Sequence, residues 1–141
     1  MLSFFSFFDY VFYRISSVYT YKWKNAHGFI YGITLVAIMQ IIHIFFVLNI
    51  LALISSDINH YCFQISKGQN FMHSGIIFPC VIVIGLNFYR YINLNSFKTL
   101  EIKWKNEILS TRKKRGWLIL LYIICNISIT SILSIYREYY L

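Results

Sequence analysis

The chain has 141 residues, of which 58% are hydrophobic and only 13% are charged, and its formal net charge at pH 7 is +8. Soluble domains are usually about 45–50% apolar and about 25% charged, so this composition excludes an ordinary soluble protein. Three long stretches contain no charged residue: 28–56, 68–89 and 116–136. A helix of about 20 apolar residues crosses a bilayer, and each stretch is long enough. The sequence therefore predicts an all-α integral membrane protein with three transmembrane helices.

The N-terminal segment, residues 3–21, is predicted to form an amphipathic helix with a wide aromatic face. Two interpretations of that face stay open. Either it lies in the inner-leaflet interface and anchors the chain, or it docks on a partner helix or on a neighbouring copy. Aromatic side chains favour the boundary between water and lipid, so the interface is the first expectation. The contact residues expected on this face are Phe4, Phe5, Phe8, Phe12 and Ile15.

The tetrapeptide KWKN occurs twice, at residues 22–25 and 103–106, each time shortly before an apolar run. Trp favours the headgroup level of a membrane and Lys reaches lipid phosphate, so position accounts for both copies. An internal duplication is the less favoured explanation. We therefore expect Trp23 and Trp104 to lie in the interface.

The predicted spans, residues 28–55, 71–92 and 116–136, contain polar residues that usually form hydrogen bonds between helices, each worth about 1 kcal/mol. His43 is the titratable residue nearest mid-membrane, and Gln40 is a candidate partner on the same helix face. No acidic residue lies inside a predicted span, which argues against a proton-coupled transporter. The polar seam expected between the helices consists of Gln40, His43, Asn49, Asn87, Asn126 and Thr130.

The connection after the first span, residues 57–70, is expected on the outer side of the membrane. His60, Cys62 and, at the start of the next span, His73 are possible metal ligands. Their spacing matches no compact zinc motif and a fourth ligand is not evident. We therefore expect no metal site.

The connection before the third span, residues 95–115, is predicted to form a short basic cytoplasmic helix, after which Gly116 lets the chain turn. Phe97 and Trp104 belong to its apolar stripe. Beside a membrane helix, a basic run is accounted for by the anionic lipids of the inner leaflet and by insertion topology. Nucleic acid is a less favoured partner. The basic run consists of Arg112, Lys113, Lys114 and Arg115.

The basic residues are distributed unevenly along the chain. Three precede the first span, one lies in residues 57–70, eight lie from Arg90 to Arg115, and one lies in the tail, residues 137–141. Lys and Arg stay on the cytoplasmic side during insertion. This distribution predicts an N-terminus in the cytoplasm and a C-terminus outside.

No catalytic constellation is evident in the sequence. It contains no glycine-rich phosphate loop, no paired carboxylates within reach of a span, and no Ser or Cys with an evident base and orienting acid. We therefore expect no enzyme. A haem would need a second axial ligand at the depth of His43, which a single chain does not offer, so we expect no cofactor.

The stretches YVFYRISSVYTYKWK (10–24) and KKRGWLILLYII (113–124) resemble a loose group of small uncharacterised bacterial multi-pass inner-membrane proteins. These proteins share an aromatic amphipathic N-terminal segment and a basic cytoplasmic hairpin. The resemblance implies a location in the bacterial inner membrane, and it assigns no activity and no functional residue.

Two functional hypotheses follow from the sequence. The first is a non-enzymatic inner-membrane interaction protein, of the subunit, accessory or immunity type, that binds another membrane protein or further copies of itself. The alternative is a homo-oligomeric pore or membrane-disrupting effector, whose lining would be Gln40, His43, Asn49, Asn126 and Thr130.

Overall fold

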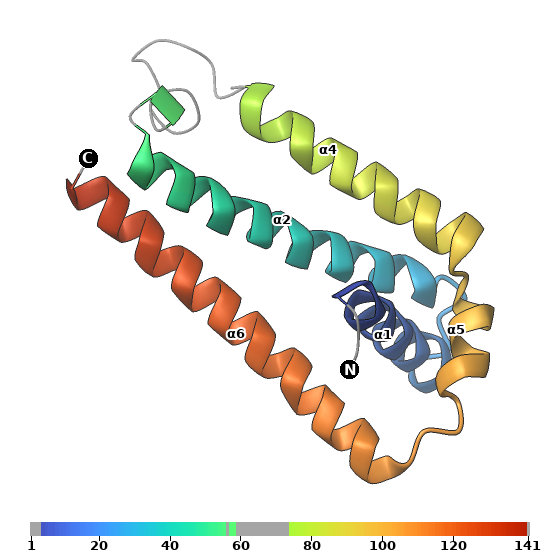
Figure 1. Ribbon diagram of the computed structural model, residues 1–141. Coiled ribbons are helices and arrows are strands. Elements are labelled where there is room, and N and C mark those ends of the chain that lie inside the picture. Colours follow the sequence, from blue (N-terminus) through green and yellow to red (C-terminus); the bar gives the residue numbers. More distant parts are fainter. Residues whose placement is uncertain (1–3, 56, 59–73, 141) are drawn as a thin grey trace.

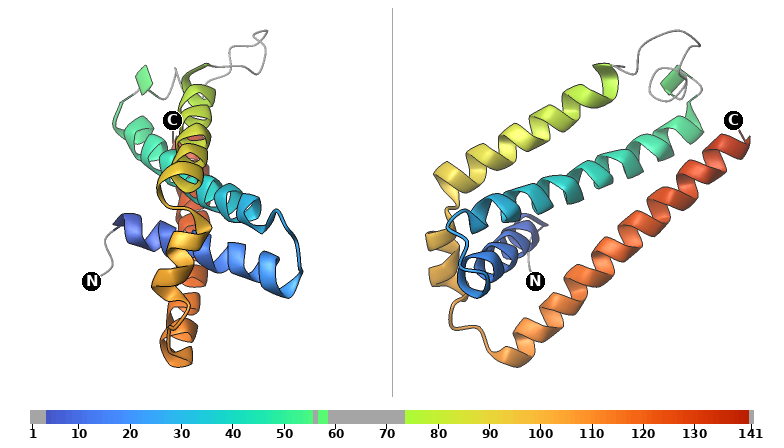
Figure 2. Two further views of the ribbon diagram at one scale, coloured as in Figure 1. Left: turned by 90° about the vertical axis from the view of Figure 1, so that its right-hand side faces the viewer. Right: turned by 180° about the vertical axis from the view of Figure 1, so that it is seen from behind.

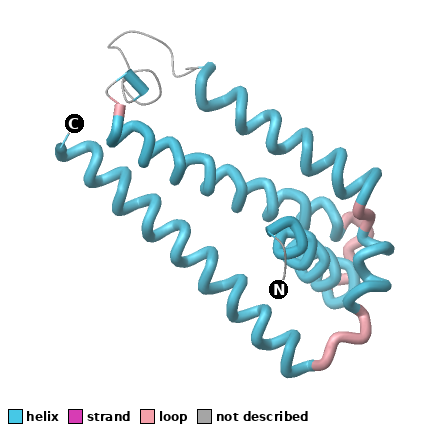
Figure 3. The backbone as a smooth tube through the Cα atoms, viewed as in Figure 1, coloured by secondary structure: helices cyan, strands magenta, loops and turns pink. Residues whose placement is uncertain are grey.

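The computed structural model of the chain describes residues 4–55, 57–58 and 74–140, and its regular elements within these ranges are all helices (Figures 1 and 3). Two helices continue as π-helical segments, η1 and η2. The elements are α1 (Phe4–Ser17), η1 (Val18–Lys22), α2 (Gly28–Ile54), α4 (Ser74–Tyr89), η2 (Arg90–Leu94), α5 (Phe97–Trp104) and α6 (Leu109–Tyr140).

Three helical segments are long and apolar enough to cross a membrane: Gly28–Ile54, Ile77–Leu94 and Leu109–Tyr139. They overlap the three uncharged stretches of the sequence, but the second also contains Arg90 and the third extends over the basic residues of 112–115. The prediction of an all-α protein with three helices of this kind is confirmed at this level.

The three long helices form a layer with α2 in the middle, α4 on one side and α6 on the other (Figures 1 and 2). The short helices α1 and α5 gather at one end of this layer, where α2 and α6 begin and α4 passes into η2. There α1 lies between α2 and α6 and runs across the direction of α6, as the left view of Figure 2 shows.

Helix α1 and its continuation η1 pack closely against the first turns of α2, where two glycines leave room for them. A Cβ atom on Gly32 would lie 2.2 Å from Ser16 Oγ and 2.9 Å from the Phe12 carbonyl oxygen. A Cβ atom on Gly28 would lie 2.3 Å from Thr20 Oγ1. The two glycines are four residues apart, a spacing that allows helix backbones to approach closely in membranes.

The buried core surrounds α1 instead of lying between the long helices. Phe8, Val11 and Phe12 of α1 are fully buried and pack with apolar residues of α2, η2 and α5. Along the most apolar 18 residues of α6, by contrast, no residue is buried. The long helices thus turn much of their apolar surface outward, and α1 ties them together at one end.

The segment 95–115 differs from the single basic helix expected there. Helix α5 ends at Trp104, a turn follows, and α6 begins at Leu109. The expected turn at Gly116 is therefore wrong. Gly116 continues α6, because glycine can adopt helical backbone and the Arg, Lys and Leu residues around it are strong helix formers. The tail is also helical, up to Tyr140.

The two KWKN segments occupy different environments. Trp23 follows η1, is 60% exposed and makes an edge contact with the ring of Tyr19. Trp104 ends α5, is only 7% exposed and contacts the ring of Tyr10. Helix α1 covers the ring of Trp104, so this ring is not available for contact with lipid headgroups, and the depth of Trp104 in a membrane stays a prediction.

Candidate functional site

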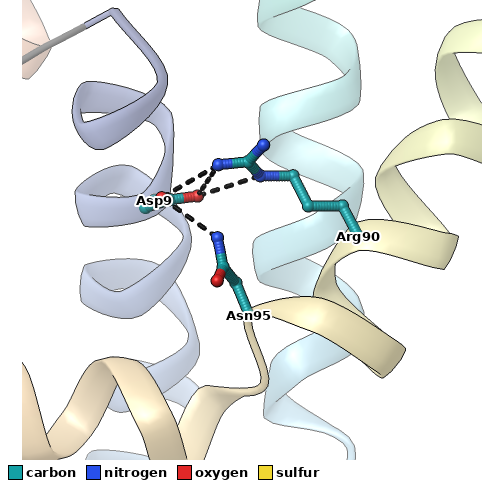
Figure 4. Close-up of polar contacts among 3 residues, drawn as sticks. All are labelled: Asp9, Arg90 and Asn95. Carbon is teal, nitrogen blue, oxygen red and sulfur yellow. Dashed lines mark hydrogen bonds and ion pairs between the residues drawn. The ribbon is translucent and has the colours of Figure 1, made fainter.

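A buried ion pair joins α1 to η2. Asp9, which is 7% exposed, accepts three hydrogen bonds from Arg90: from Nε at 3.2 Å and from Nη2 at 3.0 Å to Oδ1, and from Nη2 at 3.0 Å to Oδ2. Asn95 Nδ2 donates a fourth bond to Oδ2 at 3.3 Å (Figure 4). Burying a carboxylate is costly unless it is paired and hydrogen-bonded, and these contacts meet both conditions.

A second polar cluster joins α1 to the turn between α5 and α6 and to α6 itself. The hydroxyl of Tyr10 donates to Glu107 Oε2 at 2.6 Å, and Arg115 Nη1 lies 2.7 Å from Glu107 Oε1. The Arg115 guanidinium also lies 5.1 Å from the centre of the Tyr10 ring. Burial, with the Glu107 hydrogen bond second, raises the pKa of Tyr10 to about 12. Tyr10 is therefore a neutral donor at physiological pH.

We call these two clusters together the α1 junction, defined by Asp9, Tyr10, Arg90, Glu107 and Arg115. A related contact lies beside it, where the hydroxyl of Tyr21 donates to Glu101 Oε1. That hydrogen bond is the main cause of the raised pKa of Tyr21. The charged groups of the α1 junction bond to side chains of neighbouring segments. Their role is therefore structural.

Polar residues of the long helices meet where α2 contacts its neighbours. Asn87 Nδ2 of α4 donates to Gln40 Oε1 at 2.6 Å, and Tyr122 of α6 lies with its hydroxyl 3.2 Å from His43 Nδ1. Gln40 was the candidate partner of His43. In the structure Gln40 pairs with Asn87 instead, because Gln40 contacts α4 whereas His43 contacts α6.

The other residues of the expected polar seam differ in whether they form hydrogen bonds to a neighbouring helix. Asn49 Oδ1 accepts hydrogen bonds from Ser134 at 3.2 Å and from Arg137 at 3.0 Å. Asn126 is half-buried on α6. The hydroxyl of Thr130 is buried, with no hydrogen-bond partner in the described part of the chain. Gln40, His43, Asn49 and Asn87 therefore lie in helix contacts.

The contact surface expected on α1 is corrected at Phe8 and Phe12. Both are buried inside the chain, and the Phe12 ring stacks on Tyr91 of η2 at 4.1 Å between ring centres. The side chains of Phe4 and Phe5 lie outside the described part. The chain itself covers α1, so Phe8 and Phe12 cannot contact lipid or a partner.

The remaining expected contact residues divide by exposure. Ile15 and Phe97 are half-buried against the core, and Arg115 is held by Glu107. The exposed ones are Trp23, Lys113 and Lys114, and Arg112 is half-buried.

Two features of the structure were missed in the sequence. Asp9 is a lone carboxylate in an aromatic helix, and Arg90 lies at the end of an apolar run. Both charges need a partner, but this is only a weak signal that they pair with each other. Gly28 and Gly32 carry the spacing of a close helix contact, and this stronger signal was overlooked.

The possible metal ligands His60, Cys62 and His73 lie outside the described residues. Within the described ranges, no three His, Cys, Asp or Glu residues gather in a group that could hold a metal ion. No known protein family, curated protein or solved structure matches this chain.

Proposed function

We propose that this chain is a non-enzymatic interaction protein of the bacterial inner membrane, a small subunit, accessory or immunity-type protein that binds another membrane protein. The observation that carries the proposal is the contrast between a tightly bonded α1 junction and the outward-facing apolar surfaces of α4 and α6. A chain with this contrast has a rigid end and two helices available for lateral association.

The exposed face of α6 has features of a helix contact surface. Cys125, Ser128 and Ser131 are small, exposed residues at intervals of three along α6, and the exposed residues Ile127 and Ile129 lie among them. On α4, no other described part of the chain lies within 4 Å of the position of a Cβ atom on Gly85. Small residues let helix backbones approach each other in lipid, where close packing drives association. These faces support binding of a partner helix.

The polar contacts of α2 favour this function over the pore. Gln40, His43 and Asn49 each contact a polar side chain on a neighbouring helix. Residues that line a pore would instead present their polar groups to water.

In this proposal the end formed by α1, η2, α5 and the start of α6 faces the cytoplasm. Helix α1 lies at the level of the membrane interface, covered by the chain itself, and α5 forms the short cytoplasmic helix. The exposed lysines of this end would meet the anionic inner leaflet. They are Lys22, Lys24, Lys98, Lys103, Lys105, Lys113 and Lys114.

The test is the composition of the native complex, read with site-specific photo-crosslinking. A crosslinker at Ser128, on the exposed face of α6, is expected to attach a different membrane protein, and one at the buried Ile33 is expected to attach none. The mass of the purified complex should correspond to this chain with that protein. A ring of identical copies, with an ion leak that the Gln40→Leu/His43→Leu variant abolishes, would establish the pore instead.

A further inference from the structure

Three cations from three separate elements converge on one hollow at the α1 end of the molecule. The hollow has a volume of about 510 Å³. Lys22 of η1, Lys105 of the turn after α5, and Arg112 in the first turn of α6 contribute to its lining. These residues are far apart in the sequence, so the fold alone brings them together.

Within the described part of the chain, the protein neutralises the charge of this hollow only in part. Among the described residues, no carboxylate lies within 4.0 Å of the charged groups of Lys22, Lys105 or Arg112. The one acidic residue in the lining, Glu101, accepts the hydrogen bond of Tyr21. The lining thus carries a net formal positive charge together with tyrosine rings.

Within the basic run, the structure separates Arg112 from its neighbours. Arg112 lines the hollow, whereas Arg115 is paired with Glu107 and lines a different, apolar cavity between α1 and α6. Lys113 and Lys114 are exposed and do not line the hollow. The four residues therefore do not act as one uniform patch.

The position of the hollow favours a lipid over a soluble anion. Trp117, an exposed residue of the type enriched at membrane–water interfaces, follows Arg112 by five residues, or about 7.5 Å of helix. The headgroup layer on each side of a bilayer is about 5–8 Å thick. With Trp117 at the hydrocarbon edge, Arg112 lies at the depth of the lipid phosphates.

We propose that this hollow is a binding site for the phosphate group of an anionic phospholipid of the inner leaflet. The planar guanidinium of Arg112 can form two parallel hydrogen bonds to a phosphate, and Lys22 and Lys105 add point charges from the other sides. The inference rests on the proposed membrane location, and it does not depend on the identity of any protein partner.

The test compares two variants of the full chain that lose the same number of charges. One is Lys22→Gln/Lys105→Gln/Arg112→Gln, which empties the hollow of cations. The other is Lys24→Gln/Lys98→Gln/Lys114→Gln, which removes exposed lysines outside its lining. Native mass spectrometry would measure phosphatidylglycerol retained by each, with phosphatidylcholine as the neutral reference.

The wild-type chain is expected to retain phosphatidylglycerol, and the hollow variant to bind it at least about tenfold more weakly, since about 1.4 kcal/mol already corresponds to tenfold. The outside variant should lose clearly less binding than the hollow variant, because its lysines contribute only diffuse attraction to the anionic leaflet. Equal losses in both variants would mean diffuse attraction and overturn the site. Displacement of the lipid by an equal concentration of glycerol 3-phosphate would indicate a soluble ligand and overturn the lipid assignment.

A measurement on the unmodified chain removes any dependence on folding of the variants. Phosphatidylglycerol with a photoreactive headgroup is expected to label peptides that contain Lys22, Lys105 or Arg112, and labelling confined to other peptides would overturn the site. Release of the wild-type chain from membranes by alkaline carbonate would contradict the membrane location itself. A chain that resists carbonate but shows no difference between the variants contradicts only the lipid site.

Discussion

The ion pair between Asp9 and Arg90 bears on the free energy of unfolding of the chain. The side chain of Asp9 is 10% exposed and that of Arg90 is 29% exposed, so water screens the pair only in part. Removing one member of a buried pair leaves an uncompensated charge, which costs about 3–5 kcal/mol when burial is complete. The partial exposure of Arg90 reduces this figure.

We predict that Asp9→Asn and Arg90→Gln each lower the free energy of unfolding by about 2–3 kcal/mol, because each leaves the opposite charge without its partner. The double variant should lose clearly less than the two single losses combined. Chemical unfolding in detergent micelles, arranged as a double-mutant cycle, measures this coupling. Strictly additive losses would show that the two side chains do not stabilise each other.

Tyr10 gives the α1 junction a dependence on alkaline pH. Burial and the Glu107 hydrogen bond raise its pKa from 10.0 to about 12, so the folded chain holds the phenol proton more tightly than the unfolded chain does. Its contribution to stability is then fully present below pH 10 and is lost as the pH rises from 10 to about 12. The loss amounts to about 3 kcal/mol.

We predict that Tyr10→Phe makes unfolding less sensitive to pH in this range, because phenylalanine has no proton to lose. The unfolding midpoint of both chains, followed by circular dichroism at several pH values above 10, measures the difference. Parallel pH profiles for the two chains would contradict the assignment of this alkaline transition to Tyr10.

At the scale of elements, the contact of α1 with α2 depends on the absence of a side chain at residue 32. We predict that Gly32→Ala lowers the free energy of unfolding by about 1–3 kcal/mol, because the added Cβ would lie 2.9 Å from the backbone oxygen of Phe12. Thermal unfolding in detergent measures the change.

Gly85→Ala and Gly116→Ala are the matched controls, since among the described residues an added Cβ meets nothing within 4 Å at either position. Both glycines lie inside helices, so alanine there should be neutral or stabilise by up to about 1 kcal/mol. A loss of stability in Gly116→Ala would indicate a turn at this residue, and equal effects at residues 32 and 85 would contradict the close contact of α1 with α2.

At the scale of the whole molecule, the fold gathers most basic residues at one end. Helix α6, with 32 residues at about 1.5 Å each, is roughly 48 Å long and exceeds the hydrocarbon core of about 30 Å. Its basic first turns can therefore stand outside the hydrocarbon, at the same end as η1 and α5 (Figure 1). One end of the molecule is thus suited to the cytoplasmic face.

We predict that a reporter fused after Leu141 lies outside the cytoplasm and that one fused before Met1 lies inside it. An alkaline phosphatase fusion at the C-terminus should be active, because this enzyme requires an oxidising compartment, and a fluorescent protein at the N-terminus should fluoresce. The reverse pattern would overturn the orientation, and with it the assignment of the α1 end to the inner leaflet.

The amino-acid sequence was sufficient to predict the helical class and the approximate positions of the three long apolar helices. Exclusion of charge over some 20 residues is a local property that needs no knowledge of neighbours. The periodicity of residues 3–21 likewise indicated a helix at α1. The sequence could also have indicated the close contact at Gly28 and Gly32, because four-residue spacing of glycines can be read directly.

What covers each helix depends on the packing of the whole fold and could not be read from the sequence. The aromatic face of α1 suits lipid, a partner or the chain's own helices equally well in composition, and the fold selects the last for Phe8 and Phe12. The partners of Asp9, Gln40 and His43 are likewise set by contacts between residues far apart in the sequence. Burial and pairing depend on how helices pack in space, whereas the tendency to form a helix and to cross a membrane is determined along the chain.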